Sequence, residues 1–160
     1  MTVKVGDKVP SAKFKFMSAD GMKDMTTDEL FAGKKVALFA LPGAFTPTCS
    51  AKHLPGFIEK AAELKAKGID KIACVSVNDA FVMDAWGKQQ NAGDKVAMLG
   101  DGNGEFTKAM GLTMDGTANG MGTRSQRYAM VVDNGVIKQL FVEQPRAYEV
   151  SSAEHMLKNL

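Results

Sequence analysis

One cysteine of this chain lies where a buried strand gives way to a long helix. Cys49 follows the apolar run Lys35–Leu41 and the loop Pro42–Thr48, and a helical pattern begins directly after it. In open α/β sheets, ligands bind at this carboxyl edge of the strands. Free N–H groups and the positive end of the helix dipole stabilise an anion in the first helical turn, and a thiolate is such an anion. The position predicts that Cys49 is a reactive thiolate rather than a small buried apolar side chain.

A thiolate by itself does not account for a fast enzyme. An unperturbed cysteine is only a few per cent ionised near neutral pH, so complete ionisation accelerates its reactions by about thirtyfold, or about 2 kcal/mol. The remaining acceleration must come from groups that stabilise charge as a substrate bond breaks. The candidates are the Thr46 hydroxyl, the N–H groups at the helix start, and a cation from elsewhere in the chain.

The elements that position this cysteine form a strand–helix–strand unit. Lys35–Leu41 is a continuous apolar run, which is typical of a strand covered on both faces. Apolar residues then recur at intervals of three and four over Leu54–Leu64, which predicts an amphipathic helix, and Pro55 should kink it. Lys71–Val77 is a second buried strand, so the three elements have the order of a parallel crossover.

The second half of the chain follows a different order. Arg127–Val132 and Val136–Val142 are joined through Asn134-Gly135, a strong hairpin signal because Asn-Gly tolerates positive φ. A last helix is expected over about Ser152–Leu157. A βαβ half followed by a ββα half predicts an α/β protein of the thioredoxin-like fold, with a central mixed sheet and helices on both faces. We expect residues 1–160 to form one domain.

Composition excludes several classes of protein. The 160 residues carry a net charge of +2, with 45% hydrophobic and 24% charged residues, which is ordinary for a globular domain and does not predict nucleic-acid binding. No apolar run approaches the roughly 20 residues of a membrane span, and the N-terminus lacks the apolar segment of a secretory signal. We therefore expect a cytoplasmic protein with neither a membrane nor a nucleic-acid partner.

The cysteines and histidines exclude other chemistries. There is no Cys-x-x-Cys, so the usual motif of a thiol–disulfide oxidoreductase is absent. A zinc site from Cys49, Cys74, His53 and His155 would need spacings unlike those of zinc fingers, and we expect no metal and no cofactor. His53 follows Cys49 by four residues, but a Cys–His hydrolase also needs an oxyanion hole and an orienting carboxylate, and no motif for either is evident. A binding or chaperone module without enzymatic activity remains the other alternative.

Pro42, Thr46 and Cys49 stand as Pro-x-x-x-Thr-x-x-Cys, which resembles the active-site signature of peroxiredoxins. The longer string Pro-Gly-Ala-Phe-Thr-Pro-Thr-Cys-Ser, followed by Lys52–Phe57, is similar to the type II (Prx5) subfamily. The likeness extends through Lys4–Pro10, Ser76–Val82, Trp86 and Arg124–Val132. It therefore covers essentially the whole chain.

The resemblance implies a role for each residue of the signature. Cys49 would be the peroxidatic cysteine, and Thr46 would hydrogen-bond both its thiolate and the peroxide. Arg127 matches the active-site arginine of the family, since a fixed guanidinium can hold a thiolate charged and donate to a developing oxygen anion. Pro42 would shield the thiolate from water and line the substrate site with Thr48. The reaction would leave a sulfenic acid on Cys49 and release water or an alcohol.

The resemblance also bears on partners. Cys74 is either a buried strand thiol or a resolving cysteine that forms a disulfide with Cys49, and no cysteine follows it near the C-terminus. We expect an external thiol as reductant, with glutathione and glutaredoxin ahead of thioredoxin, and hydrogen peroxide or an organic hydroperoxide as substrate.

Relatives form homodimers, in which Phe45 of the active-site loop could face the partner. His53 is interpreted as lining the site or as structural, and Arg124 as a supporting or interface residue.

Overall fold

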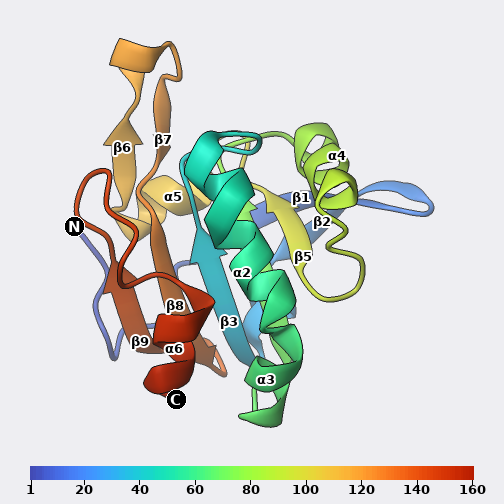
Figure 1. Cartoon of the computed structure of the whole chain (residues 1–160), viewed down its shortest axis with the longest axis vertical. Coiled ribbons are helices and arrows are strands. Elements are labelled where there is room, and N and C mark those ends of the chain that lie inside the picture. Colours follow the sequence, from blue (N-terminus) through green and yellow to red (C-terminus); the bar gives the residue numbers. More distant parts are fainter.

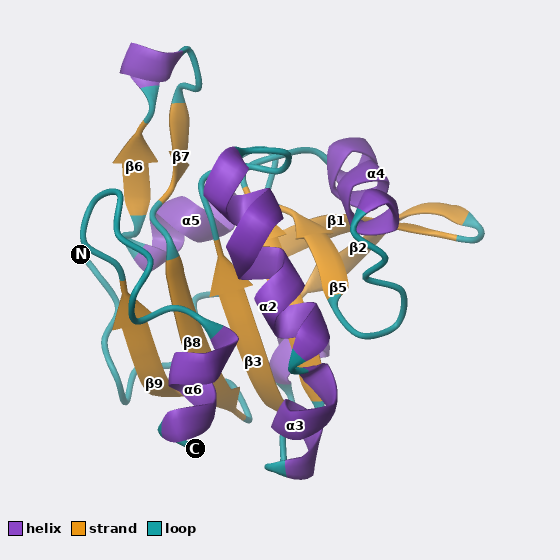
Figure 2. Ribbon diagram, viewed as in Figure 1, coloured by secondary structure: helices purple, strands orange, loops and turns teal.

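The computed structural model describes all of residues 1–160 and has one large mixed sheet at its centre (Figure 1, Figure 2). The strands of this sheet lie in the order β2-β1-β5-β4-β3-β8-β9, and β6 and β7 form a separate two-stranded ribbon. The ribbon extends away from the body of the molecule at the top of Figure 1.

The strands are β1 (Lys13–Ser18), β2 (Gly21–Thr26), β3 (Lys35–Ala40), β4 (Lys71–Ser76), β5 (Ala97–Gly100), β6 (Thr113–Asp115), β7 (Thr123–Ser125), β8 (Tyr128–Asp133) and β9 (Val136–Val142). The helices are α1 (Thr27–Phe31), α2 (Leu54–Glu59), α3 (Ala61–Ala66), α4 (Ala80–Gln89), α5 (Glu105–Met110) and α6 (Ala153–Lys158). Two short segments differ in winding, a π-helical turn over Cys49–His53 and a 3-10 turn over Thr117–Asn119.

The middle of the sheet is parallel and its edges are antiparallel. β3 and β4 run parallel, as do β4 and β5, whereas β8 pairs with β3 antiparallel. Asn134 and Gly135 connect β8 to β9 with φ of 49° and 82°, the left-handed conformations that this two-residue turn requires. The predicted crossover and hairpin are both present.

Two apolar layers cover the two faces of the sheet. One layer packs α2, α3, α4 and α6 against one face, and Trp86 and both cysteines belong to it. The other layer packs α1 and α5 against the opposite face, around Phe14 and Tyr128. In Figure 1, α2, α3 and α6 lie in front of the sheet and α5 lies behind it. The predicted thioredoxin-like architecture, with helices on both faces, is confirmed.

The helix after Cys49 differs from the expected kinked α-helix. Pro55 has no N–H to donate within the helix, and the turn before it is wound as a π-helix, in which the Leu54 N–H donates to the Cys49 carbonyl. A second break at Lys60 separates α2 from α3. The sequence prediction did not include the β1–β2 hairpin, β5 or the β6–β7 ribbon, all of which are short or partly exposed.

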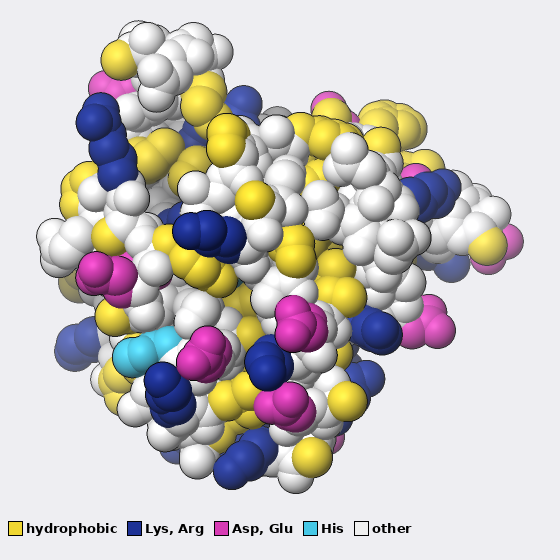
Figure 3. All heavy atoms as spheres, in the orientation of Figure 1, with side chains coloured by type: hydrophobic (Ala, Val, Ile, Leu, Met, Phe, Trp, Pro, Cys, Tyr) yellow, Lys and Arg dark blue, Asp and Glu magenta, His cyan; other side chains and the backbone are white.

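The exposed surface shows no dominant charge. In Figure 3, lysine or arginine and aspartate or glutamate side chains alternate over the face that carries α3 and α6. No helix is long and apolar enough to cross a membrane. No group of three or more His, Cys, Asp and Glu side chains is arranged to hold a metal ion.

Candidate active site

Cys49 is fully buried at the start of the π-helical turn. The Ser50 N–H, directly after Cys49, donates to the Thr46 carbonyl at 2.9 Å, which makes it the first hydrogen bond of the helix. N–H groups in the first turn of a helix have no carbonyl of the same helix to bind and are available to an anion. The sulfur of Cys49 therefore lies at the end of the helix that favours negative charge.

Arg127 supplies the cation that faces this sulfur. Its Nη2 donates to the Cys49 Sγ at 3.1 Å, and its Nη1 lies 2.8 Å from the Nδ1 of His53. Arg127 directly precedes β8, which is paired with β3, the strand that leads into the active-site loop. The antiparallel pairing thus brings the start of β8 beside the end of β3 and places residues 78 positions apart in contact.

His53 orients the guanidinium and stays neutral. Its Nε2 lies 2.9 Å from the Ser151 carbonyl, so Nε2 carries the proton and donates, while Nδ1 accepts from Arg127. Burial, together with the positive charge of Arg127, lowers the pKa of His53 to about 3. Arg127 is therefore the positive charge facing Cys49, and His53 is its hydrogen-bond acceptor.

Thr46, Thr48 and Pro42, the other residues predicted for the site, lie in the active-site loop. The Thr46 Oγ1 donates to the Gly43 carbonyl at 2.7 Å and makes no hydrogen bond to the Cys49 sulfur. The expected bond from Thr46 to the thiolate is thus absent, because its single hydroxyl proton is used inside the loop. The lone pairs of Oγ1 remain able to accept a proton from a substrate. Thr48 and Pro42 are half-buried beside it, and the Thr48 side chain makes no hydrogen bond.

Arg124 fastens the active-site loop to the β6–β7 ribbon. Its Nη1 donates to the Pro42 carbonyl at 3.1 Å and its Nε to the Met121 carbonyl at 2.9 Å. The guanidinium lies so close to the loop that a Cβ on Gly43 would come within 2.7 Å of Nη1. From the other side, the Asn78 Oδ1 accepts from the Ala44 N–H at 3.0 Å.

Phe45 stands out in this loop because it is half exposed and has a φ of 64°. Its ring lies 6.4 Å from that of Trp86, whose indole N–H donates to the Ser50 hydroxyl at 3.0 Å. Positive φ is uncommon for a bulky side chain and costs conformational energy. The loop is held in this conformation by its fixed neighbours and presents the aromatic ring to solvent.

Cys74 lies in the middle of β4, paired with Phe39 on one side and Met98 on the other. It is fully buried in the same apolar layer as Cys49, and both cysteines are free thiols. Burial raises the pKa of the Cys74 thiol well above its usual range, the Cys49 charge adds to this, and Arg127 opposes it. Cys74 is therefore an un-ionised thiol near neutral pH.

The arrangement around Cys49 can stabilise negative charge on sulfur and on an oxygen beside it. The thiolate faces a guanidinium and a helix start, and the Thr46 hydroxyl oxygen is an acceptor for a substrate O–H. Sequence reasoning placed Cys49, Thr46 and Arg127 together but left the role of His53 open. The four-residue spacing of Cys49 and His53 was the available signal, since such spacing puts two side chains on one helix face.

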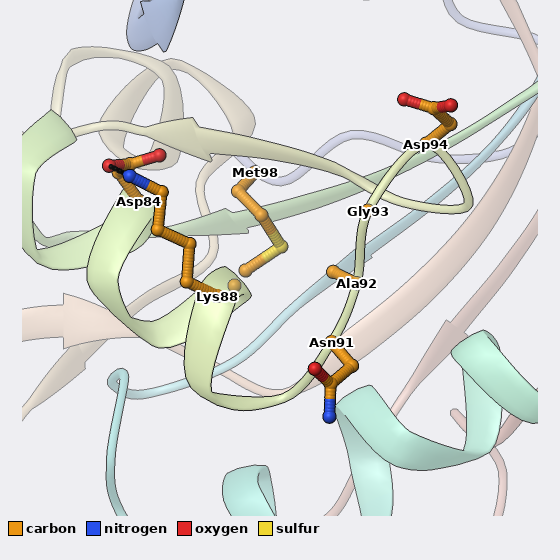
Figure 4. A pocket seen from close by; sticks show the side chains of 8 residues that line it. Asp84, Lys88, Asn91, Ala92, Gly93, Asp94 and Met98 are labelled. Carbon is orange, nitrogen blue, oxygen red and sulfur yellow. Dashed lines mark ion pairs between the residues drawn. The ribbon is translucent and has the colours of Figure 1, made fainter.

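A hollow in the surface lies away from this site. It has a volume of about 510 Å³, between α4 and the chain that leads into β5 (Figure 4). Asp84 and Lys88 form an ion pair of 3.0 Å along one side, and Asn91, Asp94 and Met98 line the rest. It contains none of the residues predicted for the site, and a thiolate reacting with a small molecule needs no large cavity.

Comparison with known proteins gives the family. The Redoxin family model matches residues 4–157. The chain is 57% identical to peroxiredoxin-2E-2, chloroplastic, of Oryza sativa subsp. japonica, over 99% of this chain and 73% of that protein. It is 48% identical to peroxiredoxin-2B of Arabidopsis thaliana, over 99% and 98% of the two chains.

A solved structure agrees with these sequences. Reduced Prx3 from Vibrio vulnificus, in complex with hydrogen peroxide, superposes with a TM-score of 0.95 at 56% identity, covering 99% of each chain. The buried thiol facing an arginine, the thioredoxin-like fold and these full-length likenesses lead to one conclusion. The chain belongs to the peroxiredoxin family, in its type II (Prx5) subfamily, and is a thiol-dependent peroxidase.

Proposed function

We propose that Cys49 is the peroxidatic residue and that Arg127 and Thr46 hold the peroxide against it. The observation that carries the proposal is the 3.1 Å hydrogen bond from the Arg127 Nη2 to the Cys49 Sγ. A fixed cation beside a buried sulfur favours the thiolate and can donate to the oxygen that becomes negative as the O–O bond breaks. Thr46 accepts the peroxide hydrogen, because its own proton is donated to Gly43.

The reaction is a displacement on oxygen. The Cys49 thiolate forms an S–O bond with one peroxide oxygen while the O–O bond breaks, and the other oxygen leaves with the electron pair and takes up a proton. Cys49 becomes a sulfenic acid, and the leaving oxygen becomes water or an alcohol. Pro42 and Thr48 form the surroundings of the bound peroxide. The Vibrio vulnificus relative bound to hydrogen peroxide supports this substrate, and organic hydroperoxides require only the same O–O group.

The reductant of the proposed cycle is an external thiol. A resolving cysteine attacks as a thiolate, and burial in the middle of the sheet keeps Cys74 protonated. The external thiol, glutathione with glutaredoxin or thioredoxin, therefore takes the role of a resolving cysteine. The thiolate of this reductant attacks the sulfenic sulfur of Cys49 and releases water. A second thiol then exchanges with the mixed disulfide and restores Cys49.

The active-site loop also supports a homodimer. Phe45 and Phe81 are exposed at 50% and 63%, and aromatic side chains of this size are enriched in the cores of protein interfaces. A second copy that covers the active-site loop would bury the Phe45 ring. The cytoplasmic location expected from the sequence remains a prediction.

The test is the intact mass of the reduced protein after one equivalent of hydrogen peroxide, followed by peptide mapping. We expect the rapid gain of one oxygen, confined to Cys49. A link between Cys49 and Cys74, with the loss of two hydrogens, would replace the external thiol by Cys74. If Cys49 did not change rapidly, the assignment of Cys49 as the peroxidatic residue would be wrong. The Cys49→Ser variant is the matched control and should gain nothing.

A further inference from the structure

Glu143 is a carboxylate of the active-site region that the proposed reaction does not use. It follows β9 directly and is 7% exposed. In Figure 1 the chain from β9 to α6 runs as a long loop in front of β8. Because β9 ends at Val142, Glu143 is the first residue of this loop. Acidic residues are seldom buried to this degree unless they are paired or hydrogen-bonded.

One oxygen of this carboxylate holds the far end of the loop. The Glu143 Oε2 accepts from three consecutive backbone N–H groups, those of Glu149, Val150 and Ser151, at 2.8, 2.9 and 2.8 Å. It also accepts from the Ser151 hydroxyl at 2.7 Å. Partial burial raises the pKa of Glu143, but the hydrogen bonds from Ser151, Glu149 and Val150 outweigh it, so the pKa is lowered and the carboxylate stays charged.

The loop that Glu143 holds is the one that contacts His53 and Arg127. The Ser151 carbonyl accepts from the His53 Nε2 at 2.9 Å. The Tyr148 ring lies edge-on to His53, with centroids 5.3 Å apart, and 5.9 Å from the Arg127 guanidinium carbon. The Tyr148 hydroxyl donates to the Lys52 carbonyl at 3.3 Å.

The hydrogen bonds close into a ring. Glu143 N–H donates to the Arg127 carbonyl at 3.0 Å, while the side chain of Arg127 bonds His53. His53 bonds Ser151, and Ser151 bonds the Glu143 carboxylate. Every member of the ring has its orientation fixed by the next, and Arg127 is the member that touches the Cys49 sulfur.

We propose that Glu143 is a positioning residue for the Cys49 reaction, which holds the Arg127 guanidinium on the sulfur through Ser151 and His53. The proposal rests on the proposed role of Arg127. Without the carboxylate, three adjacent N–H groups lose their common acceptor, and the loop no longer fixes the Ser151 carbonyl. His53 then loses the bond that sets its tautomer and ring orientation, and Arg127 loses a fixed acceptor.

The test compares Glu143→Gln and Glu143→Ala with Glu149→Gln. Glu149 is exposed, and only its backbone bonds Glu143, so its variant removes a carboxylate from the same loop without breaking the ring. We measure the peroxide reaction of Cys49 by stopped flow and its alkylation by iodoacetamide with peptide mapping. The unfolding midpoint of each variant shows whether it is folded, and Glu143→Met, which keeps the length of the side chain but removes the acceptor, serves if Glu143→Ala does not fold. Glu143→Gln keeps one acceptor oxygen and tests for rescue.

We expect Glu143→Ala to slow the peroxide reaction on the order of tenfold, the loss expected for a small displacement of a reacting group. Glu143→Gln can place its amide oxygen where Oε2 lies and should lose less than Glu143→Ala. Alkylation of Cys49 at a fixed pH should slow as well, and Glu149→Gln should match the wild type. In an Arg127→Gln background, Glu143→Ala should have little further effect, because both substitutions act on one interaction.

Two outcomes would overturn the proposal. One is a folded Glu143→Ala variant with unchanged peroxide and alkylation rates, and the other is the same loss with and without Arg127. If Arg127→Gln itself had no effect, the proposed function of Arg127 would fail instead, so the two failures are distinguishable.

Discussion

Cys49 and Cys74 are both fully buried and belong to the same apolar layer of the molecule, yet their surroundings differ. Cys49 stands at a helix start with a guanidinium 3.1 Å from its sulfur. Cys74 stands in the middle of the sheet, where strands flank it on both sides and burial raises its pKa. Burial therefore does not decide the chemistry of a cysteine. The donors and the positive charge that reach its sulfur decide it.

The strongest test of this contrast is to remove the cation. Arg127→Gln should lower the peroxide reaction rate of Cys49 by about 10²–10³, the effect of losing one donor that stabilises charge in the transition state. Arg146→Gln, at an exposed position, is the matched control and should leave the rate unchanged. Stopped-flow kinetics with hydrogen peroxide measures both. An Arg127→Gln rate within twofold of the wild type would mean that another group activates Cys49.

A second test asks whether His53 contributes charge beside Cys49. The pKa of His53 is about 3 in the folded protein, against an ordinary value of 6.5. The unfolded chain therefore binds a proton that the folded chain does not, and stability is lost as the pH falls from about 6.5 toward 3. We expect this residue to account for about 2–3 kcal/mol of the loss in unfolding free energy between neutral pH and pH ~4.5.

The measurement is urea unfolding at several pH values for the wild type, His53→Gln and His155→Gln. His155 lies on α6, outside the site, and its variant should keep the acid sensitivity. His53→Gln should lose most of it. If His53→Gln kept the whole pH dependence, His53 would not be the neutral acceptor described here.

A third test addresses the other cysteine. Cys74→Ala should lower the unfolding free energy by about 1–2 kcal/mol, because it removes a buried sulfur and leaves a small cavity. It should leave the rate of the first peroxide reaction as in the wild type. Urea unfolding and stopped-flow kinetics on the same preparation separate the two effects. If Cys74→Ala lost the first peroxide reaction while its stability stayed normal, Cys74 would take part in the reaction, and the two cysteines would not differ as described.

The smallest expected effect belongs to Thr46. Thr46→Val keeps the shape of the side chain but removes an acceptor for the peroxide and a donor to Gly43. We expect about a tenfold lower reaction rate, or about 1.4 kcal/mol, the loss of one hydrogen bond. Thr123→Val, at an exposed position of β7, is the control. An unchanged rate in Thr46→Val would show that Thr46 acts only within the loop.

The sequence was most informative where local pattern and buried structure coincide. β3, β4 and β8 are largely apolar runs, and β9 follows the Asn134-Gly135 turn; the predicted bounds of all four lie within one residue of the observed ones. The β1–β2 hairpin was not predicted, although Lys13–Phe16 alternates charged and apolar residues as a half-buried strand does. β6 and β7 have three residues each, which is too short to show a period. The stability of short, partly exposed strands depends on the side chains that pair across them, which periodicity does not report.

The site shows the same division. Cys49, Thr46 and Arg127 were found through their motif, but the hydrogen bonds of Thr46 and the contacts of Glu143 were not. A carboxylate that follows a strand has no signature of its own, because its function depends on a loop that returns to it six to eight residues later. Side-chain geometry at this level requires the folded chain.

The π-helical turn at Cys49–His53 has a consequence for comparing sequences. A π-helical turn is equivalent to an α-helix into which one residue has been inserted, and Leu54 bonds the carbonyl five positions before it. Aligning this chain with a thioredoxin-fold protein whose helix is regular therefore requires a one-residue gap between Cys49 and Pro55. The position chosen for that gap decides which residue is matched to His53, so alignments made without structure will misplace the partner of Arg127.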